Sequence, residues 1–403
     1  MEQHRPAEIG PARSLVLVFF TFLTLTLVQV AIPLRLEQLG FGTILIGCLL
    51  ALPSLTGLLT EAPFAALSDA AGRRVVISIG AVLIVGAAVI LGLTVSPWLF
   101  AIALLVYGTG LGAQTSSLMA ALSESVPLRW SAHVQGWNGA VQRVGALGVA
   151  GLLTLTSEPV TLLWFVGVAG VACFALTVVV PVWHQLHAQR PHAFRTSIAA
   201  WGLLRRSRFV QVAAMNNIVL SMLFITTNSF VGLILVGNAS TVALPALILA
   251  RDGVSIVLAL AFGPVAARVG WRTCFVAGMS SGTLGMLIGV LAPSDSLWLV
   301  ATFALAGVAI GFGIAGANLT VTLGTAPTER ATGMVAAGYA GRLTSLLAPI
   351  VLALALSHLA GPGVFGVAFV ITAAASARAA WLLHRETQGG TLGGPVAPIQ
   401  SIS

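Results

Sequence analysis

Long apolar runs follow one another along almost the whole sequence, and short polar connections separate them. A helix that crosses the roughly 30 Å of hydrocarbon in a bilayer needs about 20 mostly apolar residues. The connections carry the turn-forming residues Gly, Pro, Asp and Ser, as in Ser96-Pro97 and Gly361-Pro362-Gly363. The pattern predicts twelve membrane-spanning helices, near residues 14–36, 43–67, 75–96, 98–123, 134–156, 160–183, 209–236, 241–266, 273–292, 297–323, 331–357 and 362–384.

The composition agrees with a membrane protein. Only 7% of the 403 residues are charged and 58% are hydrophobic, with a mean hydropathy of +1.01. An ordinary soluble domain has about 25% charged residues, which cover its core with polar surface. We therefore expect an all-α membrane protein that has the lipid bilayer as its solvent. We do not expect an enzyme, because no nucleophile, base and metal ligands cluster in the sequence.

All 19 basic residues are arginines, and the formal net charge is +8. They stand one to three at a time between apolar runs, whereas nucleic-acid binders carry a contiguous basic face, so no nucleic-acid partner is expected. If both termini are cytoplasmic, Arg35 is the one arginine in the outer connections. Cytoplasmic connections of membrane proteins are enriched in arginine. This predicts a multi-pass protein of the plasma (inner) membrane with both termini cytoplasmic. The arginines on the inner side are then Arg5, Arg13, Arg73, Arg74, Arg129, Arg190, Arg195, Arg205, Arg206, Arg208, Arg268, Arg272, Arg330, Arg378 and Arg385.

The two halves of the sequence resemble each other at an offset of about 200 residues. Ser96-Pro97-Trp98-Leu99 corresponds to Ser296-Leu297-Trp298-Leu299, and Gly110-Leu111-Gly112 corresponds to Gly311-Phe312-Gly313. Each match is short, but their nearly constant offset indicates a duplicated unit of six helices. Internal repeats of this kind are typical of secondary transporters.

The repeat predicts the domain organisation. We expect two pseudo-symmetric six-helix bundles, at residues 1–183 and 208–385, joined by a basic cytoplasmic linker at residues 184–207. Residues 386–403 are expected to form a disordered tail. Within the linker, residues 194–208 are compatible with an amphipathic helix on the inner leaflet, or with a solvated segment that only carries cytoplasmic arginines.

One connection carries a family motif. The run Ala65-Ala66-Leu67-Ser68-Asp69-Ala70-Ala71-Gly72-Arg73-Arg74 lies between the second and third predicted spans. It resembles the signature loop of the major facilitator superfamily, Gly-x-Leu-Ala-Asp-x-x-Gly-Arg-Lys/Arg. Asp69, Gly72, Arg73 and Arg74 match this loop, and Ala65 replaces its first Gly. The second half carries a remnant, Gly270-x-Arg272.

The resemblance implies twelve helices in two bundles and transport by alternating access. It implies that the loop holds the halves together in the outward-open state; a carboxylate at a helix end can pair with arginines and with a helix N-terminus. The run Thr109-Gly110-Leu111-Gly112-Ala113 resembles the fourth helix of drug and metabolite exporters, although Val106 replaces their Arg. Gly136 and Gly145 have the spacing of an antiporter motif, although Val149-Ala150 replaces its Gly-Pro.

Five charged residues fall inside predicted spans: Glu61, Arg143, Arg251, Asp252 and Arg342. A charge at this depth costs about 2.5–3.5 kcal/mol on insertion scales, so each is a functional candidate. The family fold brings the second helix against the eleventh and the fifth against the eighth. The resemblance therefore implies the pairs Glu61–Arg342 and Arg143–Asp252, with Arg251 left unmatched or turned to an anionic solute. Such pairs can be static links, gates that respond to protonation, or anion-binding arginines.

Uncharged polar residues in the spans are candidates for lining a solute path. Among aliphatic neighbours they favour an amphipathic or apolar solute, although each can equally be a hydrogen bond between helices. These candidates are Gln29, Gln114, Gln135, Asn138, Gln142, Asn217, Asn228, Asn318 and Tyr339.

The leading hypothesis is a secondary active transporter that exports a small organic solute in exchange for protons. No ATP-binding loop, cofactor motif or metal-ligand spacing occurs in the sequence, so we expect no cofactor and no metal, and an ion gradient as the driving force. An uptake or exchange carrier for an organic anion is the alternative, supported by three intramembrane arginines. A non-transporting sensor or scaffold is a third hypothesis. One chain of twelve helices can form a complete path, so we expect a monomer.

Overall fold

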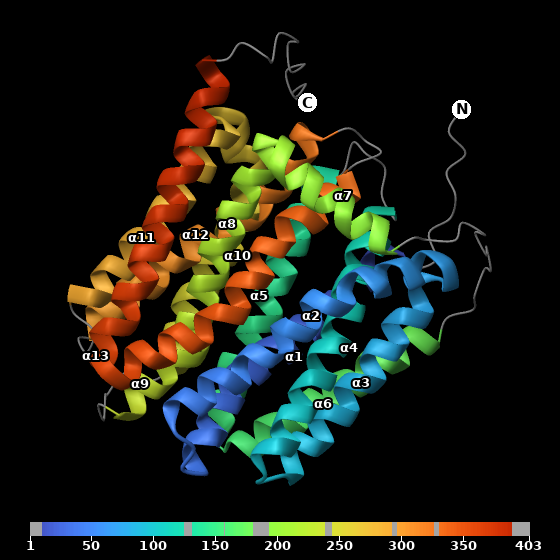
Figure 1. Ribbon diagram of the computed structural model, residues 1–403, viewed down its shortest axis with the longest axis vertical. Helices are drawn as coiled ribbons and strands as arrows, with labels where there is room; N and C mark the ends of the chain where they lie inside the picture. The colour runs from blue at the N-terminus through green and yellow to red at the C-terminus, as the bar shows by residue number, and fades with distance from the viewer. Residues whose placement is uncertain are drawn as a thin grey trace.

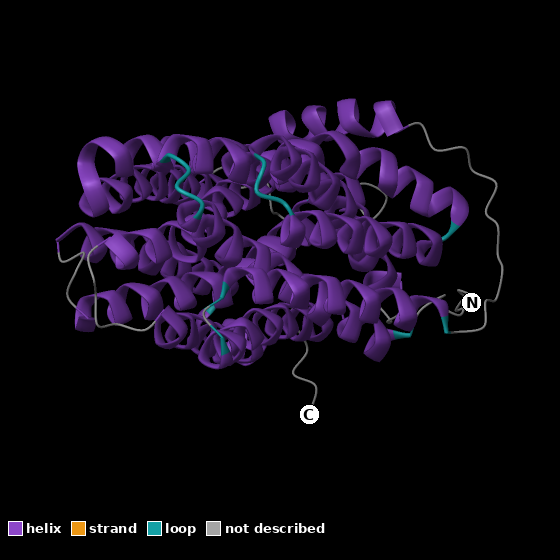
Figure 2. Ribbon diagram, turned by 90° about the horizontal axis from the view of Figure 1, so that it is seen from below, coloured by secondary structure: helices purple, strands orange, loops and turns teal. Residues whose placement is uncertain are grey.

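The structure is a computed structural model that describes residues 10–124, 131–156, 158–179, 193–237, 244–291, 296–325 and 330–388. Within these ranges the chain is helical except for short connections, and no strand occurs (Figure 2). The helices of the first half begin and end within five residues of the predicted spans. They are α1 (Pro11–Gln38), α2 (Thr43–Ala71), α3 (Arg73–Leu93), α4 (Pro97–Glu124), α5 (Ser131–Leu155) and α6 (Pro159–Val178).

The second half has the same plan with two irregularities. Its seventh pass is interrupted by a π-helical turn, η2, and its last two passes form one continuous helical element. The elements are α8 (Arg208–Ile225), η2 (Thr226–Phe230), α9 (Val231–Gly237), α10 (Leu244–Val269), α11 (Trp271–Leu291), α12 (Ser296–Gly324) and α13 (Arg330–Gln388).

The long element α13 contains two passes because it bends sharply at Ala360. Ala360 has φ 56° and ψ −161°, a conformation that is not helical, and Pro362 follows it. A proline in a helix interior removes a hydrogen-bond donor and clashes with the preceding turn. Figure 1 shows the two arms of α13 leaving this bend and diverging toward the other end of the bundle.

Ten helices among the described residues are long and apolar enough to cross a bilayer. α13 counts once among them although it passes twice. α5 falls outside the ten because Asn138, Gln142 and Arg143 interrupt its apolar sequence. With the second pass of α13 and with α5, the described helices make the predicted twelve passes.

The linker contains one further helix, α7 (Ala193–Arg206), which lies across one end of the bundle (Figure 1). Ala200 and Leu203 are buried against the first turns of α8 and α13, whereas Trp201, Arg205 and Arg206 are exposed. The structure therefore has a helix in the linker, docked on the bundle by its apolar face. The linker before residue 193 and the tail after residue 388 lie outside the described residues.

The buried apolar side chains show how the halves meet. We call the end of the bundle opposite α7, where α9 and the bend of α13 lie, the distal end. At the distal end one continuous cluster joins the halves, and it contains Leu27 and Ile32 of α1 together with Phe230 and Leu352. Within the second half this cluster continues to the α7 end, with Phe275 and Leu382, and smaller clusters of described residues lie apart from it there.

The separate clusters belong to different halves. One lies among α1, α3, α4 and α6, around Leu17 and Leu118. Another lies among α7, α8, α12 and α13, around Val210 and Ala336, with Leu58 of α2 packed against it. The halves therefore share an apolar core at the distal end, whereas the smaller clusters at the α7 end lie mainly within one half each.

Two helix pairs form the lateral contacts between the halves: α2 with the first arm of α13, and α5 with α10. The first contact is close because α2 has glycine there. A Cβ atom at Gly47 would lie 2.5 Å from the Cβ of Ala353 and 2.6 Å from the carbonyl oxygen of Pro349. Small residues of this kind let membrane helices approach closely.

Candidate functional site

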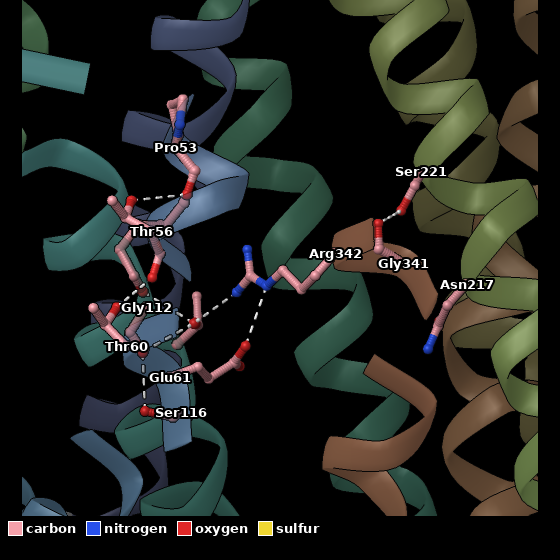
Figure 3. Close-up of polar contacts among 12 residues, drawn as sticks. Pro53, Thr56, Thr60, Glu61, Gly112, Ser116, Asn217, Ser221, Gly341 and Arg342 are labelled. Atoms are coloured by element: carbon pink, nitrogen blue, oxygen red, sulfur yellow. Dashed lines mark hydrogen bonds and ion pairs between the residues drawn. The ribbon is translucent and has the colours of Figure 1, made fainter. Parts of the chain in front are cut away.

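An ion pair joins the halves where α2 meets α13. Nε of Arg342 lies 3.2 Å from Oε2 of Glu61 (Figure 3). The Arg342 guanidinium also donates to the hydroxyl of Thr115 on α4 at 3.4 Å. Both charged side chains are 23% exposed. We call Glu61, Thr115 and Arg342 the Glu61 cluster; its formal charge is zero.

Arg342 is held in place by the helix behind it. Ser221 of α8 donates to the carbonyl of Gly341 at 3.1 Å (Figure 3). Asn217 of the same helix donates to the carbonyl of Ala337 at 3.0 Å. These bonds fix the α13 backbone against α8 directly beside Arg342. The guanidinium therefore reaches across to the first half from a supported helix, and any movement between the halves must stretch or break its bond to Glu61.

A second charged cluster lies where α5 meets α10, and its side chains are buried. Nη1 of Arg143 on α5 lies 3.8 Å from Oδ1 of Asp252 on α10, with the two side chains 3% and 0% exposed. Arg251 binds both oxygens of the same carboxylate, at 3.0 and 2.7 Å. We call Arg143, Arg251 and Asp252 the Asp252 cluster.

The pairing of Arg251 corrects the sequence-based expectation, which left this residue unmatched or turned to a solute. Its guanidinium binds Asp252 and also donates to the hydroxyl of Thr227, at 2.6 Å, and to the side-chain oxygen of Asn228. Neighbouring residues of a helix do not normally face each other. The long Arg side chain folds back to the carboxylate because Arg251 is fully buried and no water can solvate it.

The π-helical turn connects this cluster to the first half. Asn228 donates to the side-chain oxygen of Gln29 on α1 at 2.7 Å, and Ser229 donates to the Gln29 backbone carbonyl at 3.1 Å. A π-helical turn inserts one extra residue and often marks a functional site. Here it directs three consecutive polar side chains, Thr227, Asn228 and Ser229, to α1 and α10. These bonds join α1 of the first half to the seventh pass of the second half.

Aromatic rings cover the faces of the buried guanidinium groups. The Arg143 guanidinium carbon lies 4.5 Å from the ring centre of Phe224 on α8 and 5.8 Å from that of Phe22 on α1. The sequence-based candidates omitted Phe22, Phe224, Thr115 and Ser229. The repeat offered a signal for the two rings, since positions 22 and 224 correspond at nearly the offset of the two halves.

Several polar candidates from the sequence instead form bonds within one half. The Gln114 side-chain oxygen accepts from Thr21 at 3.0 Å, Asn217 binds the α13 backbone, and Asn138 is buried with its amide 3.4 Å from the sulfur of Met119. Gln142 is also buried, and Tyr339 is buried beneath Trp201 with the rings stacked at 5.9 Å. Asn318 is half-buried, and the side chain of Gln135 lies outside the described residues.

The sequence model of the Major Facilitator Superfamily matches residues 14–250, more than half of the chain. The chain belongs to the Major Facilitator Superfamily. It is therefore a multi-pass membrane transporter rather than an enzyme. A search of curated protein sequences gave no match.

Solved structures of the superfamily share this fold. A variant of the nucleoside transporter NupG matches with a TM-score of 0.73 at 12% identity, covering 92% of this chain and 99% of that one. The human organic anion transporter MFSD10 (TETRAN) matches with a TM-score of 0.70 at 15% identity, covering 91% and 98%. NupG itself matches with a TM-score of 0.70 at 12% identity, covering 93% and 98%. Identities this low show the fold alone.

The superfamily loop lies at the α7 end. Gly72 joins α2 to α3 with φ +95°, and Gly270 occupies the equivalent turn of the second half with φ +86°. Arg73 donates to the hydroxyl of Ser68 at 3.1 Å, and Arg74 donates to the backbone carbonyl of Val178 at the end of α6. The latter contact lies inside the first half.

Asp69 of the loop motif and Arg272 of its remnant are the other two charged residues expected at these turns. The side chain of Asp69 lies outside the described residues, so its expected pairing with neighbouring arginines stays a prediction. In the second half, the Arg272 guanidinium carbon lies 5.6 Å from the ring centre of Trp271, so this arginine packs on its neighbour at the start of α11.

Proposed function

We propose that this transporter moves a small organic solute by alternating access and that proton exchange drives export. The observation that carries the proposal is the pair of inter-half contacts, Glu61–Arg342 and Arg143–Asp252. Rocking of one half against the other changes the distances between α2 and α13 and between α5 and α10. Charged pairs placed across those contacts bias the equilibrium between conformations.

The proposed orientation rests on the positions of the arginines. With the α7 end in the cytoplasm, the exposed Arg205 and Arg206 and the loop arginines Arg73 and Arg74 all lie on the inner side, as the positive-inside rule requires. The joined distal core and the Gln29–Asn228 bond support the proposal that this conformation is inward-facing. Both termini are proposed to be cytoplasmic, in the plasma (inner) membrane.

Glu61 is the proposed proton acceptor. Its carboxylate is 23% exposed and has an arginine partner across the interface, whereas Asp252 is 0% exposed and is shared by two arginines. Water can reach Glu61 without disturbing the packed helices. Protonation removes its negative charge and with it the ion pair to Arg342, so proton binding and separation of α2 from α13 are linked.

A thermal-shift screen of the purified protein against diverse solutes at two pH values identifies a stabilising solute. Its flux is then measured in proteoliposomes with and without a pH gradient. Wild type should respond to the gradient, and Glu61→Gln should still exchange the solute at equal concentrations but ignore the gradient. Glu158→Gln, an exposed carboxylate at the start of α6, is the control and should match wild type.

The outcomes separate the hypotheses. A Glu61→Gln protein that responds to the pH gradient as wild type does contradicts proton coupling at this residue. Absence of flux for every stabilising solute favours the sensor or scaffold hypothesis.

The second candidate function is uptake or exchange of an organic anion. It is supported by three arginines, Arg143, Arg251 and Arg342, against two carboxylates in the two clusters, and MFSD10, one of the structural neighbours, is named as an organic anion transporter. The test measures whether a labelled anion accumulates on the cytoplasmic side against its own gradient. Such accumulation would distinguish this candidate from export.

A further inference from the structure

The Asp252 cluster holds one positive charge more than its carboxylate can neutralise. Two guanidinium groups and one carboxylate give a formal charge of +2 − 1 = +1 in a place where the three side chains are 0–3% exposed. The helices packed around the cluster are α1, α8, α10 and α12, and besides Asp252 they carry a single acidic residue, Glu37 in the last turn of α1. A buried charge without a counter-charge is costly.

The excess charge belongs to Arg143 rather than to Arg251. Arg251 makes two short bonds to Asp252 and two more to Thr227 and Asn228. Among the described residues, the polar contact of Arg143 is the 3.8 Å approach to the same carboxylate, and its buried Nε has no hydrogen-bond partner there. An arginine fork binds a carboxylate best through two parallel bonds, and Arg143 has the free donor for this.

The surroundings of Arg143 suit a ligand that has an apolar body. Phe22 and Phe224 lie at its guanidinium from α1 and α8, one from each half, and both rings are half-buried rather than buried. Arg143 is thus at the meeting point of the two halves, near the middle of α5. The Glu61 cluster, by contrast, is neutral and its arginine already binds Glu61 and Thr115.

We propose that Arg143 binds the carboxylate of an organic monoanion with an apolar body, and that this anion replaces Asp252 as the partner of Arg143. The proposal rests on the transport function proposed above and names the class of solute. Asp252 loses little in the exchange because Arg251 holds both of its oxygens. Arg143, however, is the ionic link from α5 to α10, so arrival of the anion releases the two halves from each other at this contact.

The first test compares carboxylates with their neutral amides. Binding of octanoate and benzoate, and of octanamide and benzamide, is measured by calorimetry and thermal shift on the purified full-length protein. The carboxylates should bind wild type at least tenfold more tightly than the amides. Arg143→Gln should remove this preference and Arg143→Lys should weaken it. Arg385→Gln, which makes the same charge change in the exposed last turns of α13, should keep it.

The second test measures the release of the halves. The Cβ of a side chain at Gly139 would lie 3.8 Å from the Cβ of Ala259, which suits a disulfide between α5 and α10. In a protein with Gly139→Cys and Ala259→Cys, and with Cys48, Cys173 and Cys274 replaced by alanine, octanoate should slow disulfide formation several-fold. Octanamide should leave the rate unchanged. This test needs no substitution at Arg143, so it remains informative if Arg143→Gln fails to fold.

Equal binding of acids and amides to wild type overturns the proposal, as does full carboxylate affinity in Arg143→Gln or an octanoate-independent disulfide rate. Neither test requires transport. A protein that prefers carboxylates through Arg143 but moves no solute contradicts the transport function alone, and a protein that moves a solute without this preference contradicts the anion site alone.

Discussion

Replacing Glu61 and Arg342 by glutamine, singly and together, measures how strongly the two halves are held at this contact. The charged atoms are 3.2 Å apart. At an effective dielectric constant of about 20, Coulomb's law gives an attraction of about 5 kcal/mol at this separation. Because each side chain is 23% exposed, solvent screening and the cost of ordering both side chains remove most of this attraction.

The expected coupling energy is about 1–2 kcal/mol. It lies above the value for exposed ion pairs, about 0–1 kcal/mol, and below the roughly 3–5 kcal/mol for breaking a buried pair. If the pair forms in only one conformation of the transporter, loss of this coupling energy changes the equilibrium constant between the two conformations by roughly 5- to 30-fold. Arg342 keeps its bond to Thr115 when Glu61 is replaced, which limits the damage in that single variant.

The assay is unfolding of the purified protein by increasing SDS in mixed micelles, for wild type, Glu61→Gln, Arg342→Gln and the double variant. The sum of the losses in unfolding free energy of the two single variants should exceed the loss of the double variant by the coupling energy. Glu158→Gln serves as the control for removal of an exposed carboxylate and should change stability by less than about 0.5 kcal/mol. Additive losses, within about 0.3 kcal/mol, would refute the idea that this pair joins the halves.

Three further predictions concern single residues. Asp252→Asn should lower the free energy of unfolding by about 3–5 kcal/mol in the same assay. It leaves the side chains of Arg143 and Arg251, which are 3% and 0% exposed, without a counter-charge. A loss below about 1 kcal/mol would contradict the argument from burial. Gly47→Ala should lower the free energy of unfolding by about 1–3 kcal/mol, because its Cβ would lie 2.5 Å from that of Ala353. In the matched control Gly86→Ala, the new Cβ meets nothing within 4 Å, so this change should be neutral or stabilising. Gly72→Ala should cost about 1–3 kcal/mol because φ +95° with ψ 149° suits glycine alone, and an unfolding curve that overlays wild type would refute this.

Much of the architecture was predictable because a bilayer imposes it locally. The thickness of the hydrocarbon sets the length of each apolar run, so span positions can be read without knowledge of neighbouring helices. The structure joins the last two passes in one helical element, α13, but the sequence predicts two spans there because Gly361-Pro362-Gly363 indicates a turn. The same local reasoning places the charges at membrane depth, because they interrupt apolar runs.

The inter-half partners were predictable at the level of helices and not of atoms. The family resemblance implied Glu61 opposite Arg342 and Arg143 opposite Asp252, and the structure brings both pairs together. It did not indicate that Arg251 would fold back onto its neighbour Asp252. Pattern reasoning locates the helix that faces a charge, but the conformation of a long side chain depends on every group that packs around it.

The sequence by itself determined the membrane environment, the twelve passes, the duplicated halves and the positions of the five intramembrane charges, because each depends on local composition and spacing. Only the tertiary structure decided the π-helical turn that directs Asn228 to Gln29, the docking of α7, the shared apolar core at the distal end and the unequal sharing of Asp252 by two arginines. These features depend on the rotation and approach of helices that are far apart in the chain. Packing across both halves sets that geometry, and no single segment encodes it.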